Sequence, residues 1–161
     1  MLVREMEQKE CQDLLVRLSF GRLACVRDNC PYIVPIYFAA EPHRLFAFAT
    51  MGQKIEWMRS NPQVCIEVDE VKSHTNWSSV VVQGRYEEFP DTAKYAKERQ
   101  LAQTLMEKRS MWWQIGFAAA QTRGQFDRDI PVFFCIHIDK ISGRHATTDP
   151  VEASLALESS R

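Results

Sequence analysis

A phosphate-binding segment is the main chemistry that the residue types and spacing of this chain indicate. Residues 44–50 alternate like a strand and residues 51–62 have helical spacing, so a strand leads directly into a helix start. The first N–H groups of a helix lack partners and carry partial positive charge, which favours an anion there. Thr50, Gln53 and Lys54 would add a hydroxyl, an amide and a cation. The segment predicts a phosphomonoester site; the alternative is an ordinary strand-to-helix turn with a solvated lysine.

Other familiar catalytic motifs do not occur in the sequence. It has no GxSxG elbow, P-loop, HExxH or GxGxxG pattern, which disfavours hydrolase and classical dinucleotide-binding functions. The histidines lie in separate segments, so we expect no metal centre; they are His43, His74, His137 and His145. The five cysteines are an odd set, and charges occupy the N-terminal segment where a secretory signal would be apolar. We therefore expect a cytoplasmic protein with reduced thiols.

Composition narrows the class of protein further. A chain of 161 residues with 45% hydrophobic and 25% charged residues is typical of one folded domain. The net charge of −1 argues against nucleic acid or an anionic membrane as the partner. No apolar run approaches the roughly 18 residues of a spanning helix. We expect a single domain over residues 1–148 and a flexible tail over residues 149–161.

The elements that must position the phosphate segment are mostly strands. Alternation or β-branched runs predict six strands, at residues 21–27, 31–40, 44–50, 63–71, 77–89 and 131–139. Pro31 and Pro35 cannot donate ladder hydrogen bonds, so the second strand should lie at a sheet edge or face a ligand. Gly84 should mark a bulge or a close approach. The hairpins favour a mainly β fold, a small antiparallel β-barrel with peripheral helices.

Three helices are expected around this barrel. They are residues 5–18, the segment that follows Thr50, and a helix capped by Pro90-Asp91 that runs to about Lys108 with Leu101 and Leu105 one turn apart. Residues 110–129 read as an irregular loop with Trp112, Trp113 and Phe117, and such loops are usually functional or lie at an interface.

The order of these segments resembles the pyridoxamine 5′-phosphate oxidase-like flavoproteins, and most closely the branch with the nitroimidazole-resistance proteins. The resemblance rests on GRLACVRDNCPYIVPIYFAA, RLFAFATMGQKIEWMRSNPQVCIEVDEV and WSSVVVQGRYEEF, with WW and ISGR further on, and covers nearly residues 15–145. It implies the FMN-binding split barrel, a homodimer with two FMN sites at the subunit interface, and oxidoreductase chemistry on a small molecule.

The resemblance also implies site residues. Val34, Pro35, Ile36 and Tyr37 match the stretch that lines the flavin ring. Ala49 and Thr50 match residues that contact the ribityl chain and the phosphate, and Gln53 and Lys54 match the phosphate clamp. Trp77, Ser78 and Ser79 match residues near the flavin. Trp112 or Trp113 matches an aromatic residue that packs on the flavin from the partner subunit. Packing in the core or at a dimer interface is the alternative for the tryptophans. The chain ends without a convincing match to the substrate-binding segment of the true oxidase, so pyridoxamine phosphate oxidation is not expected.

The function that follows is an FMN-dependent reductase. A reduced nicotinamide would reduce the flavin, and a nitro compound or quinone would accept the electrons. This chemistry requires no protein acid or base, and no catalytic residue is assigned. A flavin- or haem-binding carrier or sensor, with one of the four histidines as axial ligand, is an alternative. A deazaflavin-dependent reductase and a dimeric scaffold without cofactor are two more.

Overall fold

Two strands joined by a tight turn form one edge of the fold. The computed structural model describes residues 1–108 and 131–148, and in it β2 (Phe20–Arg27) pairs antiparallel with β3 (Cys30–Tyr37). The turn residues Asp28 and Asn29 have φ of 51° and 61°. Asp and Asn tolerate this left-handed conformation, and it matches the twist of a two-residue hairpin. A hairpin between the predicted strands 21–27 and 31–40 is confirmed.

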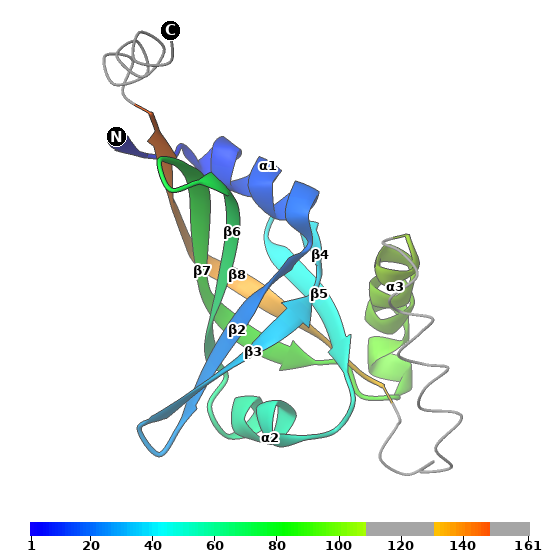
Figure 1. Cartoon of the computed structure of the whole chain (residues 1–161). Coiled ribbons are helices and arrows are strands. Elements are labelled where there is room, and N and C mark those ends of the chain that lie inside the picture. Colours follow the sequence, from blue (N-terminus) through cyan, green and yellow to red (C-terminus); the bar gives the residue numbers. More distant parts are fainter. Residues whose placement is uncertain (109–130, 149–161) are drawn as a thin grey trace, which may run out of the picture.

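The described residues form one antiparallel sheet of eight strands. The further strands are β1 (Leu2–Glu5), β4 (Ala39–Glu41), β5 (Arg44–Ala49), β6 (Gln63–Ser73), β7 (Asn76–Glu88) and β8 (Val132–Thr147). Their order is β3-β2-β6-β7-β8-β5-β4, with β1 paired to β8. The two outermost strands, β3 and β4, are separated in the chain by Phe38 alone, so the sheet has to curl round on itself (Figure 1). The predicted mainly β barrel, with β3 at an edge, is confirmed.

The number of strands was predicted too low, because two short strands lack an alternating pattern. The four-residue β1 is exposed throughout and exists through its pairing with β8. β4 is a separate strand of three residues that pairs with β5, so the predicted strand 31–40 is divided. β8 continues through ISGRHAT for 16 residues. These three outcomes depend on pairing partners rather than on local sequence.

Gly84 has the close contact that was expected of it. The register between β7 and β8 shifts between Gln83 and Gly84, which is a bulge or irregularity. A Cβ atom at Gly84 would lie 2.2 Å from the carbonyl oxygen of His137. Only glycine fits this contact between the two strands without movement of the backbone.

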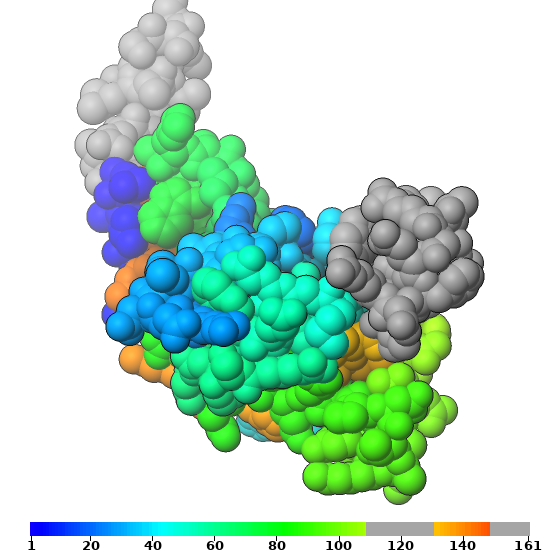
Figure 2. Space-filling model, turned by 90° about the horizontal axis from the view of Figure 1, so that it is seen from below, coloured from blue at the N-terminus to red at the C-terminus, as the bar shows by residue number. Residues whose placement is uncertain are grey.

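In the described part of the chain, three α-helices surround the sheet. The first, α1 (Gln8–Leu18), lies across β4 and β8; the second, α2 (Gln53–Ser60), closes the end of the barrel beside the β2–β3 hairpin; the third, α3 (Ala96–Glu107), packs on β5 and β8 (Figures 1 and 2). None of the helices in the described part combines the length and hydropathy needed to cross a lipid bilayer.

Two helix boundaries differ from the prediction. The first helix begins at Gln8, because the preceding residues join the sheet as β1. The third begins only at Ala96, after a 3₁₀ turn (Ala93–Tyr95), and Asp91 is not its cap. Its buried face is Ala102 and Met106, and Leu105 is partly buried against the same core cluster. Of the two leucines noted one turn apart, Leu101 is exposed, because the position of the sheet decides which side of α3 is covered.

Buried apolar side chains form two clusters. The larger fills the barrel and includes Leu23, Ile66, Val68, Val80 and Phe134. The smaller lies between the sheet and α3 and includes Phe46, Phe89, Phe133, Cys135 and Met106. β5 contributes to both, because its alternate side chains point to opposite faces of the sheet. The β5 face of Leu45, Ala47 and Ala49 is consequently filled by the core.

Candidate functional site

The start of α2 leaves backbone donors unused. Ile55 and Met58 are fully buried and fix the helix against the barrel, while Gly52 precedes the helix without a side-chain cap. The carbonyl oxygen of Gly52 accepts the N–H groups of Ile55 and Glu56 at 3.0 and 3.1 Å. Within the described residues, no hydrogen bond engages the N–H of Gln53. The helix start therefore offers an N–H donor and partial positive charge to an anion.

Lys54 adds an ammonium group to this helix start. Its side chain is half-buried, and among the described residues it has no ion pair or hydrogen bond. Burial lowers the pKa of Lys54, and the thiol of Cys25 is the titratable group that acts on it. Charged groups in partly dry surroundings are normally paired. An anionic ligand would supply the missing partner.

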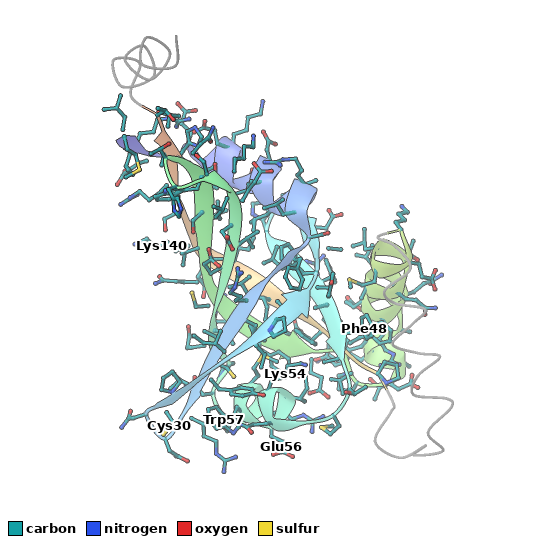
Figure 3. The ribbon with its side chains drawn as sticks, viewed as in Figure 1. Cys30, Phe48, Lys54, Glu56, Trp57 and Lys140 are labelled. Carbon is teal, nitrogen blue, oxygen red and sulfur yellow. The ribbon has the colours of Figure 1, made fainter. Side chains whose placement is uncertain are left out.

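Lys54 lies beside the β2–β3 hairpin. Cys25 is paired with Tyr32 across the hairpin, and the rings of Tyr32 and Trp57 are 5.5 Å apart, which joins β3 to α2. Figure 3 shows Lys54 between α2 and the hairpin, with Trp57 on the same helix. The phosphate segment and the first part of β3 therefore occupy the same end of the barrel.

The four residues expected on β3 point to two sides. Val34 and Ile36 pack into the barrel core, while Pro35 is exposed on the outer face and Tyr37 contacts Phe20, with ring centroids 4.6 Å apart. As an edge strand, β3 has one side free of strand partners in the described sheet. Backbone contacts to a ligand, as the resemblance implies, are compatible with this placement and stay a prediction.

The other residues near α2 have distinct surroundings. Ala49 is buried at the end of β5, whereas Thr50 and Gln53 are exposed. Of the expected phosphate-binding side chains, Thr50, Gln53 and Lys54 are thus brought together by the β5–α2 connection.

Three further expected residues lie toward the opposite end of the barrel, at the start of β7. Trp77 pairs with Val71 of β6, which is eight residues along the strand from Gln63, or about 26 Å at about 3.3 Å per residue. Because α2 ends just before Gln63, a single copy does not place Trp77 beside Lys54.

Ser78 and Ser79 point to opposite faces of β7. The Ser78 hydroxyl lies 2.9 Å from Nδ1 of His145, and the Ser79 hydroxyl donates to Glu67 at 2.9 Å. Both hydroxyls therefore have protein partners already. Trp112 and Trp113 lie outside the described residues, as does the tail over residues 149–161.

The four histidines do not come together in one site. His43 and His74 are exposed, and His145 contacts Ser78. His137 points Nε2 at a carboxylate oxygen of Glu87, 2.6 Å away, and at the sulfur of Cys135, 3.5 Å away. This cluster was missed in the sequence analysis. The spacing of Cys135 and His137 places both on one strand face, but only the register of β7 on β8 adds Glu87.

The fold and the helix start define a curled-sheet protein with a candidate anion-binding end. A family model described as pyridoxamine 5′-phosphate oxidase matches residues 7–145. The chain belongs to this family.

Individual relatives agree with this assignment. An uncharacterized protein of Rhizobium meliloti is 43% identical over 146 residues, which covers 91% of this chain and 97% of the relative. The crystal structure of a FAD-binding protein from Mesorhizobium loti is similar with a TM-score of 0.74 and 41% identity, over 92% of this chain and 99% of that one. A Bacteroides thetaiotaomicron structure, described as a 5-nitroimidazole antibiotic resistance protein, has a TM-score of 0.65 at 17% identity, over 90% and 89%. The last likeness shows the shared fold.

Proposed function

We propose that the protein binds a flavin whose phosphate lies at the start of α2. The observation that carries the proposal is Lys54, which is half-buried, has no partner among the described residues and follows an uncapped helix start. A phosphate would accept from the free helix N–H and from the Lys54 ammonium. The FAD-binding protein of Mesorhizobium loti, at 41% identity, supports a flavin as the ligand.

FMN is the flavin that we propose. In the described residues, the start of α2 offers Lys54, Gln53 and Thr50, which match one phosphate group. FAD carries a second phosphate and an adenosine, which need further partners. Because a relative binds FAD, the experiment has to distinguish the two flavins.

We propose further that the complete site lies between two copies of the chain. Lys54 lies on α2, which leads into the start of β6, and Trp77 lies on β7 opposite the far end of β6. The two residues could therefore meet only if a second copy were placed in the reverse direction. The outer face of the β2–β3 hairpin suits such a contact, because Ile33 is 63% exposed there and Pro35 lies beside it on the same face. The matching prediction is a homodimer in light scattering.

The reaction that we propose is reduction of a small nitro compound or quinone by a reduced nicotinamide. The bound flavin would supply the hydride chemistry. The chain's own residues would hold the phosphate through Lys54, present the backbone of β3 to the flavin ring, and exclude water with the apolar core beneath Val34 and Ile36. No protein acid or base is assigned to the reaction.

The test is to identify the chromophore of the purified protein. Flavin absorption bands and FMN in the denatured supernatant support the proposal, and consumption of NADH or NADPH with a nitro compound or quinone supports the reductase. Release of FAD would replace the FMN assignment while keeping the flavin site. A Soret band with no flavin would refute the flavin proposal and favour haem on a histidine. A deazaflavin would be recognised by its own spectrum. A colourless protein that does not bind added FMN would also refute the flavin proposal.

A further inference from the structure

A second cluster of chemically reactive side chains lies on the sheet near α3, away from the helix start of α2. Glu87 of β7 is paired directly with Cys135 of β8, and His137 is two residues further along β8 on the same face. The ligand atoms of the three side chains all lie within 4.8 Å of one another. Two adjacent strands, rather than a mobile loop, therefore hold a carboxylate, a thiol and an imidazole together.

One of the distances between the ligand atoms matches a tetrahedral metal centre. With Zn–S of about 2.3 Å and Zn–N of about 2.0–2.1 Å, tetrahedral ligand atoms lie about 3.5 Å apart. The Cys135 sulfur and His137 Nε2 are 3.5 Å apart. The carboxylate oxygen of Glu87 lies 2.6 Å from the same nitrogen, as a direct hydrogen bond. A metal in place of the shared proton requires this oxygen to move back by about 0.7 Å, a shift within reach of a half-exposed glutamate.

The three ligand side chains differ in their exposure to solvent. Cys135 is fully buried at the margin of the cluster under α3, whereas about a third of the side chain of His137 and two fifths of that of Glu87 are exposed. The thiol is thus packed in the core, while the imidazole and the carboxylate are in contact with solvent. This arrangement leaves a route by which an ion and a water molecule reach the cluster.

Neighbouring charges are compatible with a cation. Arg85, which is paired with His137 across the strands, is occupied by Asp139 at 2.9 Å. Arg44, on the other side of His137, lies 4.8 Å from the ring centre of Phe46. A divalent ion would be offset by Glu87 and by the thiolate that its binding creates.

We propose that Glu87, Cys135 and His137 bind one Zn²⁺, with water as the fourth ligand. Thiolate, imidazole and carboxylate are the three ligand types that zinc accepts in four-coordinate sites. In binding, the S–H bond of Cys135 breaks, a Zn–S bond forms, and the proton goes to solvent. This zinc site goes beyond the proposed flavin function and does not depend on it.

Proton release follows from the state of the free thiol. Burial, followed by the charge of Glu87, raises the pKa of Cys135 to about 12, so the thiol is protonated near neutral pH. Zinc binding should therefore release at least one proton per ion, which a pH indicator in weak buffer measures.

The test uses the purified full chain after dialysis against a chelator. Zn²⁺ affinity and stoichiometry are measured by competition with a chromophoric chelator, and Co²⁺ replaces zinc for spectroscopy. We expect one ion per chain and a thiolate-to-cobalt absorption band. Cys135→Ala and His137→Ala should each weaken zinc binding at least tenfold, and the cobalt band should disappear in Cys135→Ala. The matched controls Cys65→Ala and His43→Ala should bind zinc like the wild type.

Three results would overturn the zinc site. The first is zinc binding without a defined stoichiometry, and the second is unchanged affinity in His137→Ala. Because Cys135 is in the core and its variant could fail to fold, the half-exposed His137 carries the decision, with circular dichroism to confirm that its variant is folded. Loss of binding in Cys65→Ala or His43→Ala as well would also refute the assignment, because those thiol and imidazole groups are outside the cluster.

Discussion

Replacing Lys54 by methionine separates the proposed phosphate contact from every other contribution to flavin binding. Methionine keeps the length and apolar stem of the side chain and removes the charge. Lys54 has no protein partner among the described residues, so the variant breaks no ion pair in the free protein. Any loss of flavin affinity then reports on the ligand.

The expected loss follows from one charge-assisted hydrogen bond. Such a bond contributes about 1.5–3 kcal/mol, which corresponds to FMN binding weakened by roughly 10- to 150-fold. Riboflavin has the same ring and no phosphate, so its affinity should not change. The difference between the two ligands isolates the phosphate.

The stability of the protein without flavin should not fall in Lys54→Met, in contrast to the affinity for FMN. Because the folded state lowers the pKa of Lys54, the unfolded chain binds more protons as the pH approaches 10.5, and stability rises with pH in that window. In Lys54→Met this contribution to the rise should be absent, and the free energy of unfolding near neutral pH should be unchanged or higher.

The assay is flavin fluorescence quenching on titration into protein stripped of its ligand, together with urea unfolding. Lys72→Met is the matched control, since Lys72 is an exposed lysine of β6 beside Glu70. Equal losses for FMN and riboflavin, or no loss for FMN, would refute the phosphate assignment.

Three further predictions concern packing, an ion pair and a thiol. Gly84→Ala should destabilise the fold by about 2–3 kcal/mol in urea unfolding, because its Cβ would lie 2.2 Å from the backbone of β8, whereas Gly52→Ala, with nothing within 4 Å, should have little effect. Glu88→Gln should lower the free energy of unfolding by about 1 kcal/mol near pH 7, because Glu88 accepts two hydrogen bonds from Arg59 at 2.7 Å. Since Arg59 lowers the pKa of Glu88, this difference from the wild type should shrink as the pH falls below 4. A difference that stays constant from pH 7 to 3 would contradict the assignment. Cys30 is exposed, so it should react first with a thiol reagent, and Cys30→Ser should remove the fast phase while leaving the slow ones; a fast phase that persists would assign it to another thiol.

Much of the fold could be predicted because its signals are local. The apolar period of Val64, Ile66 and Val68 predicts one buried face of β6, and the structure confirms it. Asp28 and Asn29 predict the hairpin turn through their own backbone preferences. The alternation of residues 44–50 predicts β5, and the structure shows that both faces of this strand are covered.

Part of the candidate site could likewise be predicted from local sequence, and part could not. Thr50, Gln53 and Lys54 are close in sequence, so their grouping at the start of α2 could be predicted without a structure. The placement of Trp77 at the far end of β6 could not, because it depends on the length and register of a long hairpin. The resemblance to a family supplied both sets of residues together and did not say that one copy separates them.

By itself, the sequence determined the strand-rich class, the restriction of β3 to a sheet edge or a ligand-facing position, and the strand-to-helix junction, because alternation, proline and helix-start chemistry act over a few residues. Only the tertiary structure decided that Lys54 has no partner among the described residues, that β1 pairs with β8, and that Glu87 meets Cys135 and His137. These are contacts between segments far apart in the chain. Their geometry follows from register and from the curl of the sheet, which no local pattern encodes.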